Sequence, residues 1–205
     1  MVLDVKAKPY YFYLVVVLSL GFLAACSSSS GQRASQGAAM GGIVGAAGGM
    51  ISALVFGGNV GDAAARGAVW GASTGAVSGA IVGAQEDQAQ KNKQEARIAK
   101  LKTDLGEDAF NGLAALVECR HETALEHARK AAGQDNQNYA LAGHWLEIIT
   151  YADQQQENKA RALYPDLIAR DTKISTNGQA EESMRNALQK LMAIRTEYQL
   201  PKTCR

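Results

Sequence analysis

The distribution of apolar and charged residues divides the chain into two regions. Between residues 37 and 85 the only charged residues are Asp62 and Arg66, and glycine, alanine and branched apolar residues fill most of the rest. From Glu86 onward charged residues are frequent, and large apolar residues recur at helical spacing. No segment alternates with the period of two that a half-buried strand requires. The pattern predicts an all-α fold with a boundary near Ala84.

Glycine recurs at every fourth position in two runs of the first region. The runs contain Gly37, Gly41, Gly45 and Gly49, and then Gly67, Gly71, Gly75, Gly79 and Gly83. Four residues advance a helix by about 400°, so each run forms a stripe along one side. A helical glycine costs about 1 kcal/mol relative to alanine in water, and close contact between bare backbones can offset that loss. With the turn signal "FGGNVGD" between the runs, residues 37–84 are predicted to form a glycine-zipper helical hairpin.

The two predicted helices have the length of a membrane span but only moderate hydrophobicity. Each is about 27 to 30 Å long, close to the thickness of the hydrocarbon core. The sides opposite the glycines carry larger apolar residues such as Ile43, Met50 and Leu54. Trp70 lies near the charged turn, where a membrane interface favours an indole. Because Ser73 and Thr74 weaken the second helix, a water-soluble oligomer core or a disordered glycine–alanine tract remains an alternative.

The N-terminus has the layout of a secretory signal peptide, in which a basic start precedes the apolar run 10–25. Residues 23–26, Leu-Ala-Ala-Cys, match the lipobox of bacterial lipoproteins, whose cysteine receives a diacylglycerol before cleavage. We therefore expect a signal peptide over 1–25 and lipid on Cys26; an ordinary membrane anchor is the alternative. Ser27, in place of an aspartate, indicates the outer membrane under the usual sorting rule. Residues 26–36 read as a flexible tether.

A double glycine run directly after a lipobox resembles the glycine-zipper outer-membrane lipoproteins, a group that includes the rickettsial 17 kDa surface antigen and the SlyB-type lipoproteins. The resemblance covers residues 26–84 and rests on "GAAMGGIVGAAGG" and "GAVWGASTGAVSGAIVGA". It implies a lipid-anchored hairpin that self-associates, or packs with lipid and barrel proteins, and supports envelope integrity. The small members end in a short compact segment, whereas here about 120 polar helical residues follow.

The region after the hairpin is predicted to be helical throughout. Residues 85–105 are rich in helix formers and predict a solvated stalk that ends at Gly106. Residues 106–205 predict an α-helical domain. Within it, apolar positions from Leu113 to Ala131 keep helical spacing without a break, and a second helical segment starts near Tyr139, after "GQDNQN". Two further helices are expected over 157–170, with a kink at Pro165, and over 179–198.

The first two of these segments resemble a degenerate tetratricopeptide-type helix pair. The resemblance lies in the small residues Ala124, Ala128 and Ala131, which such repeats use for close helix packing, and in the polar turn before Tyr139. Only one partial unit is present. An ordinary helical bundle is therefore the alternative.

Two cysteines remain once Cys26 carries lipid. In an exported chain, Cys119 and Cys204 are expected to form a disulfide. The bridge would close a loop of about 85 residues and stabilise the fold by about 4 kcal/mol in the chain-entropy model. Two free thiols are the alternative.

Candidate catalytic and metal-binding groups are few. Glu118, His121 and Glu122 share one helical face and could in principle hold a divalent metal, but a solvated face is the favoured interpretation. His127 and His144 are isolated in the sequence. No Ser/His/Asp set or P-loop is recognisable. We therefore expect no enzyme activity, no catalytic or metal site, and no cofactor apart from the lipid on Cys26.

Charge also limits the partners. Of the 21 basic and 20 acidic residues, Lys6, Lys8 and Asp4 leave with the signal peptide, so the mature chain is balanced. Without a basic cluster there is no electrostatic footprint for nucleic acid.

Three functions fit these features. The leading one is a lipid-anchored outer-membrane scaffold, facing the periplasm, whose zipper packs in or on the membrane and self-associates. Its expected partners are membrane lipid, further copies of the chain and an envelope protein. The alternative is a periplasmic adaptor whose residues 106–199 dock a secretion, efflux or wall-synthesis component. A pore-forming glycine-rich hairpin is the third.

Overall fold

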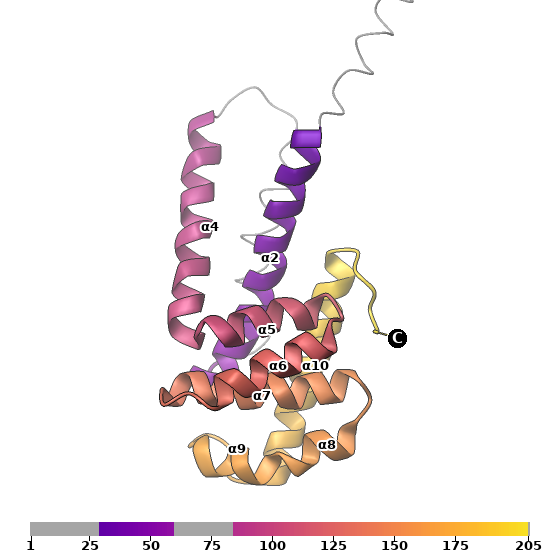
Figure 1. Ribbon diagram of the computed structural model, residues 1–205. Coiled ribbons are helices and arrows are strands. Elements are labelled where there is room, and N and C mark those ends of the chain that lie inside the picture. The colour runs from indigo at the N-terminus through magenta and orange to yellow at the C-terminus, as the bar shows by residue number, and fades with distance from the viewer. Residues whose placement is uncertain (1–28, 60–83, 205) are drawn as a thin grey trace, which may run out of the picture. The chain divides into compact units, whose positions relative to one another are not determined.

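The computed structural model describes residues 29–59 and 84–204, and every regular element in these two stretches is an α-helix (Figure 1). The helices are α2 (Ser29–Phe56), α4 (Ala84–Leu105), α5 (Glu107–Val117), α6 (His121–Ala132), α7 (Gln137–Asp153), α8 (Glu157–Ala162), α9 (Tyr164–Arg170) and α10 (Asn177–Glu197). The all-α prediction is confirmed. The chain divides into two compact units, residues 1–37 and 38–205. The second unit contains most of α2 and all of α4 to α10.

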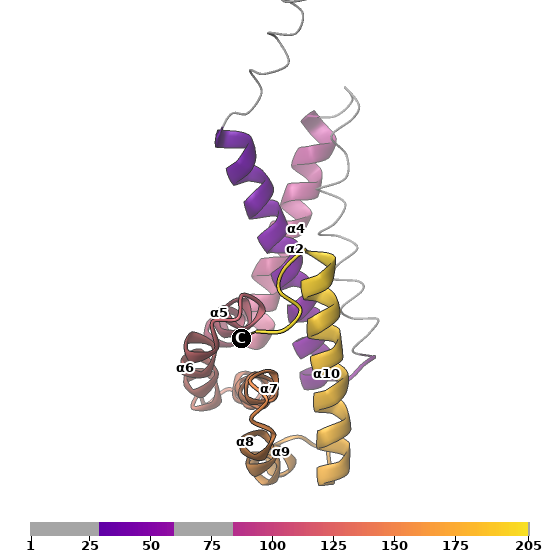
Figure 2. The same cartoon turned by 90° about the vertical axis from the view of Figure 1, so that its right-hand side faces the viewer.

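Helix α7 is the centre of the second unit. It contacts each of α4, α5, α6, α8, α9 and α10. Its residues 140–150 are all buried, which explains why large apolar residues occur on more than one side of it. The helix begins at a side-chain cap, because the Asn136 side chain accepts hydrogen bonds from the N–H groups of Asn138 (2.9 Å) and Tyr139 (3.3 Å). Figure 2 shows α7 nearly end-on, with α10 next to it and running across the direction of α7.

The prediction of one uninterrupted helix from Leu113 to Ala131 is wrong. Residues 118–120 separate α5 from α6, and Cys119 adopts a left-handed conformation with φ 62°. The turn is closed by a hydrogen bond from the Arg120 N–H to the Ala115 carbonyl (2.8 Å). Neither glycine nor proline marks this turn, so the apolar spacing continues through it. The turn brings Cys119 to the position from which it pairs with Cys204.

Small residues allow α6 to pack closely against α7, as expected for the alanines of this segment. Ala124, Ala128 and Ala131 are fully buried. A Cβ added to Gly143 of α7 would lie 2.6 Å from the Ala128 carbonyl oxygen, so the two backbones are in direct contact there. Close packing is therefore confirmed. The tetratricopeptide resemblance itself stays a prediction.

Helix α4 covers the residues for which the stalk is predicted, and Gly106 ends this helix as expected. Gly106 has φ 85°, and its N–H donates to the Lys102 carbonyl at 2.9 Å. The Tyr139 ring covers the glycine, because an added Cβ would lie 2.9 Å from Tyr139 Cγ. The Tyr139 hydroxyl donates to the Thr103 carbonyl (2.8 Å) and so ties the end of α4 to α7.

The helix expected over 157–170 is divided into two, α8 and α9, whereas the last helix differs from the expected one only near its ends. Leu163 separates α8 from α9 where a kink at Pro165 is expected, and the proline lies in the first turn of α9, where its missing N–H has no cost. Helix α10 begins at Asn177, since the Thr176 hydroxyl accepts a hydrogen bond from the Gln179 N–H (3.2 Å).

The first zipper helix is longer than predicted. Helix α2 begins at Ser29, inside the segment 26–36 that the sequence indicates as a tether, because no proline or other strong breaker separates these polar residues from the zipper. It ends at Phe56, where Gly57 (φ 85°) and Gly58 (φ 139°) turn the chain. The second zipper run, Gly67 to Gly83, lies outside the described residues. Among the described helices, none combines the length and the hydropathy that a bilayer-spanning segment requires.

Candidate functional site

The C-terminal half of α2, residues 43–56, has two opposite faces that differ in burial. The buried face carries Ile43, Ala47, Met50 and Leu54, and the opposite face, which is more exposed and which we call the uncovered face, carries Gly45, Gly49, Ser52 and Phe56. The two sets have the same spacing and are offset by two residues, or about 200° around the helix. Every side chain of the first set is buried. In the second set the first three residues are partly exposed, and Phe56 is 49% exposed.

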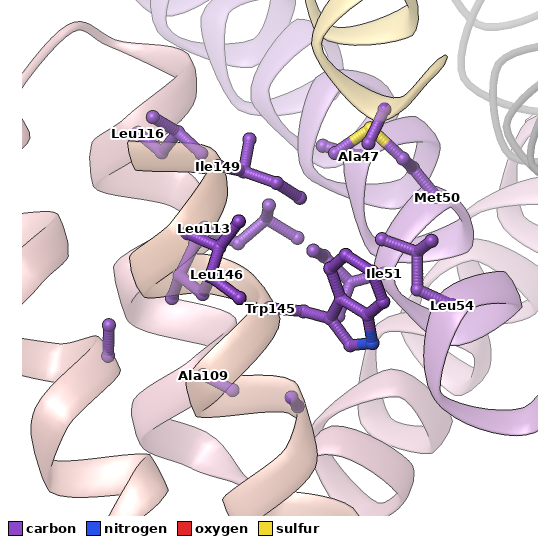
Figure 3. Close-up of a cluster of buried hydrophobic side chains, with 14 of the residues drawn as sticks. Ala47, Met50, Ile51, Leu54, Ala109, Leu113, Leu116, Trp145, Leu146 and Ile149 are labelled. Atoms are coloured by element: carbon purple, nitrogen blue, oxygen red, sulfur yellow. The ribbon is translucent and has the colours of Figure 1, made fainter. Parts of the chain in front are cut away.

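The buried face of α2 packs against the helical domain. Its side chains belong to the same hydrophobic core as Leu113 and Leu116 of α5 and Trp145 of α7. Figure 3 shows Trp145 pointing from α7 toward Ile51 and Leu54 of α2. The indole of Trp145 is fully buried. The apolar residues of the first zipper helix are therefore part of the core of the C-terminal domain.

A second contact joins α2 to α4. Leu101 of α4 lies over Gly48 of α2, where an added Cβ would be 2.8 Å from Leu101 Cδ1. Gly48 is outside the period-four run, and its lack of a side chain makes room for the leucine. One residue of the expected apolar stripe on the stalk thus contacts the zipper helix.

A chain of polar contacts fixes the C-terminal end of α2. We call Trp145, Asp171 and Lys173 the α2 latch. The Asp171 carboxylate, which is fully buried, accepts a hydrogen bond from Trp145 Nε1 (3.2 Å) and pairs with Lys173 Nζ (2.7 Å). The same Nζ donates to the carbonyl oxygen of Val55 (2.8 Å). That carbonyl is among the last four of the helix, which have no partner within the helix, and a cation there also complements the helix dipole.

A buried ionic cluster lies at the other end of the domain core. Arg195 of α10 is fully buried and forms two hydrogen bonds to Asp153, from Nη1 and Nη2, each 2.7 Å. Its Nε donates to the Val117 carbonyl (3.1 Å) and its Nη2 also to that of Leu116. His121 Nε2 completes the cluster at 2.7 Å from Asp153 Oδ2. The cluster joins the ends of α5 and α7 to α10, and hydrogen bonds compensate the buried charges.

The expected disulfide between Cys119 and Cys204 is present, with the two Cα atoms 5.4 Å apart and a sequence separation of 85. Cys204 Sγ lies 3.5 Å from Asp153 Oδ2. The bridge therefore holds the C-terminal segment against the ionic cluster.

The three residues considered as candidate metal ligands do not converge on one point. Glu118 pairs with Arg120 (2.6 Å), Glu122 is exposed, and His121 bonds Asp153 instead. In the described residues, His121, Asp153 and Cys204 do place ligand atoms within 4.8 Å of one another. However, the sulfur of Cys204 is in the disulfide, and Arg195 occupies the carboxylate of Asp153. This donor set is poorly suited to a cation, because ligation needs a thiolate and free carboxylate lone pairs.

The two isolated histidines have different environments. His127 Nδ1 lies 3.1 Å from Asp108 Oδ1. His144 is buried, and neither of its ring nitrogens has a hydrogen-bond partner among the described residues. Burial lowers the pKa of His144, and the positive charge of Arg170 lowers it further. The neutral form of His144 is therefore favoured over the charged form.

The structure tests only some of the residues that the sequence singles out. Gly37 and Gly41 lie in α2, and Gly45 and Gly49 lie on its uncovered face. The predicted lipidation residue, Cys26, and the second run, Gly67, Gly71, Gly75, Gly79 and Gly83, lie outside the described residues. Sequence reasoning missed the latch and the buried Arg195. The one available signal for Arg195 is its position directly after Ile194, within the apolar stripe of α10.

Comparison with known proteins gives one match. Residues 7–87 match the family model described as YMGG-like Gly-zipper. This match supports a glycine-zipper family for the N-terminal part of the chain, and it indicates a membrane-associated envelope protein, as is typical of glycine-zipper families. No curated protein and no solved structure matches the chain.

Proposed function

We propose that this protein is a lipoprotein of the outer membrane, anchored through Cys26, that self-associates through the zipper and acts as a structural scaffold facing the periplasm. The lipobox and the family match over residues 7–87 support the membrane association. The helical domain is then the part of the scaffold that is carried on the zipper.

The observation that carries the proposal is the division of α2 into two faces. The large apolar residues of the buried face pack in the domain of the same chain. Gly45, Gly49 and Ser52 lie on the opposite side and are only partly covered. The domain thus uses the side chains of the zipper helix and leaves the small residues for another helix.

Small residues at a spacing of four suit a helix partner. Without side chains at Gly45 and Gly49, a second backbone can approach closely and gain dispersion contacts and weak Cα–H···O bonds. The uncovered face is therefore the expected contact between copies of the chain. A scaffold of this kind has no need of a catalytic centre, in keeping with the few candidate groups in the sequence.

The oligomeric mass of the mature lipidated chain tests self-association. In mild detergent, with the mass measured by light scattering, we expect an oligomer that dissociates in the Gly45→Leu/Gly49→Leu variant. Gly178→Leu is a matched control, because it adds the same side chain to an exposed helical glycine whose nearest neighbouring atom is 3.9 Å from an added Cβ. An unchanged mass in the double variant would overturn the zipper contact.

The anchor is tested separately. Cells that produce the chain are labelled with a palmitate analogue, and their inner and outer membranes are separated. We expect label on the wild-type chain in the outer-membrane fraction and no label on Cys26→Ala. Equal labelling of the two chains, or recovery of the wild type with the inner membrane, would contradict the proposed anchoring.

A further inference from the structure

The α2 latch joins a buried carboxylate to the zipper helix through a side chain that solvent can reach. Asp171 is fully buried, and its charge is balanced by Lys173, whose side chain is 37% exposed. The same ammonium holds the Val55 carbonyl at the end of α2. Loss of the ammonium would leave both the carboxylate and the carbonyl without this partner, next to the place where Trp145 packs toward α2. The docking of α2 on the domain therefore depends on the contacts of Lys173.

Helix α2 has a second environment that can cover its apolar face. From residue 37 to Phe56 it carries no charged side chain, and it begins three positions after the predicted lipid anchor Cys26. Ile43, Met50 and Leu54 can be buried either against the domain or among acyl chains. They cannot be in both places at once. The two environments are alternatives for one surface, which is the requirement for a two-state element.

The docked state is favoured by the contacts on both sides of the interface. Release of α2 would uncover Trp145 and the apolar residues around it, which costs free energy in proportion to the exposed area. A lipid bilayer next to the anchor can offset this cost by burying the face of α2. Without the latch, the balance shifts toward that second state.

We propose that the α2 latch is an autoinhibitory contact, which keeps the apolar face of the first zipper helix on the helical domain and out of the lipid bilayer. The proposal rests on the anchoring of the protein to a membrane. Its partner is the acyl-chain region of the bilayer, into which α2 moves when Lys173 releases Val55. Release of α2 exposes the Trp145 indole, so the fluorescence of Trp145 reports whether α2 is docked on the domain.

The test uses the mature lipidated chain in vesicles of phosphatidylethanolamine and phosphatidylglycerol. Trp70→Phe leaves Trp145 as the single tryptophan. Ser52→Cys, on the uncovered face, supplies a thiol for a fluorescent label while Cys119 and Cys204 stay paired. Acrylamide quenching of Trp145 reports uncovering of the domain, and quenching of the label by brominated acyl chains reports entry of α2 into lipid.

In this background, we expect acrylamide to quench Trp145 more strongly in Lys173→Met than in the parent. We also expect brominated lipid to quench the label on α2 more strongly. Lys173→Arg keeps a cation in the latch and should behave as the parent. Lys130→Met is the matched control, because it removes an exposed lysine whose ion pair with Glu126 has the same 2.7 Å length. Circular dichroism of each variant checks whether its helix content is unchanged.

A second latch variant keeps the test decisive if Lys173→Met loses helix content. Asp171→Asn retains an acceptor for the Trp145 indole and removes the charge that holds Lys173, so it should shift both signals in the same direction. Unchanged signals in both variants would overturn the proposal. Uncovering of Trp145 without entry of the label into lipid, or with cross-linking of α2 to a second copy, would overturn it as well. The zipper contact is tested separately, by the oligomeric mass of the Gly45→Leu/Gly49→Leu variant. A negative result for the latch therefore does not affect the proposed self-association.

Discussion

Leu101 of α4 packs directly over Gly48 of α2, at a place where an added Cβ would come within 2.8 Å of Leu101 Cδ1. The contact joins the zipper helix to the stalk. We expect Gly48→Leu to lower the free energy of unfolding by about 1–3 kcal/mol through overpacking. Gly48→Ala should be nearly neutral, because a helix gain of about 1 kcal/mol offsets a small shift of the leucine side chain.

Chemical denaturation of the single and double variants measures this coupling. Leu101→Ala should recover part of the loss in the Gly48→Leu background, since it makes room for the new side chain. Additive effects of the two substitutions would show that the residues are not in contact.

Gly143 is predicted to be among the least replaceable residues of the domain. Its substitution by alanine places a Cβ 2.6 Å from the Ala128 carbonyl oxygen, and a backbone atom in a packed helix cannot move aside. We expect a loss of about 1–3 kcal/mol in the free energy of unfolding. Gly133→Ala is the control, because its Cβ would lie 3.5 Å from the nearest atom, and its effect should be much smaller. Equal effects of the two substitutions would argue against backbone contact between α6 and α7.

The buried pair of Arg195 and Asp153 is predicted to be essential for folding stability. Arg195→Met removes the partner of a carboxylate that is 4% exposed, and the expected loss is about 3–5 kcal/mol. Arg185→Met, which breaks an exposed pair with Glu181 at 3.7 Å, should cost about 0–1 kcal/mol. Thermal unfolding under oxidising conditions, with the disulfide intact, compares the two. A small effect at Arg195 would mean that its charge is solvated.

His144 makes the domain sensitive to acid. Its pKa is lowered in the folded protein by burial and by Arg170, while Asp166 and Glu147 oppose the shift. The unfolded chain therefore binds the proton more readily. Stability is fully present above the ordinary histidine pKa of about 6.5 and is lost as the pH falls through the folded-state value. As the pH falls below about 6.5, the free energy of unfolding should decline less steeply for His144→Leu than for the wild type. Identical pH profiles for the two proteins would exclude His144 as the cause.

Much of the helical domain follows from local sequence rules. The stalk over residues 85–105, its end at Gly106 and the close packing of Ala124 and Ala128 all have local causes, namely helix propensity, a left-handed glycine and small side chains. The pairing of Cys119 with Cys204 follows from their number and from the predicted export of the chain. The turn at residues 118–120 could not be predicted, because it contains neither glycine nor proline.

The position of α2 could not be predicted for a different reason. An apolar stripe of Ile43, Met50 and Leu54 satisfies a bilayer and a protein core equally well, so periodicity alone does not distinguish them. Two features hold α2 in place, the contact of Gly48 with Leu101 of the stalk and the latch at Lys173, and each depends on residues far apart in the chain. Such pairings are determined by tertiary structure.

A lysine scan of residues 43–56 tests most directly whether α2 is part of the domain core. Each variant of the mature chain is unfolded thermally while the fluorescence of Trp145 is followed in the Trp70→Phe background. The account predicts that the melting temperature falls at Ile43, Ala47, Met50 and Leu54, and that Ser52→Lys leaves it nearly unchanged. A melting temperature that does not depend on the position along α2 would contradict the docking of this helix on the domain.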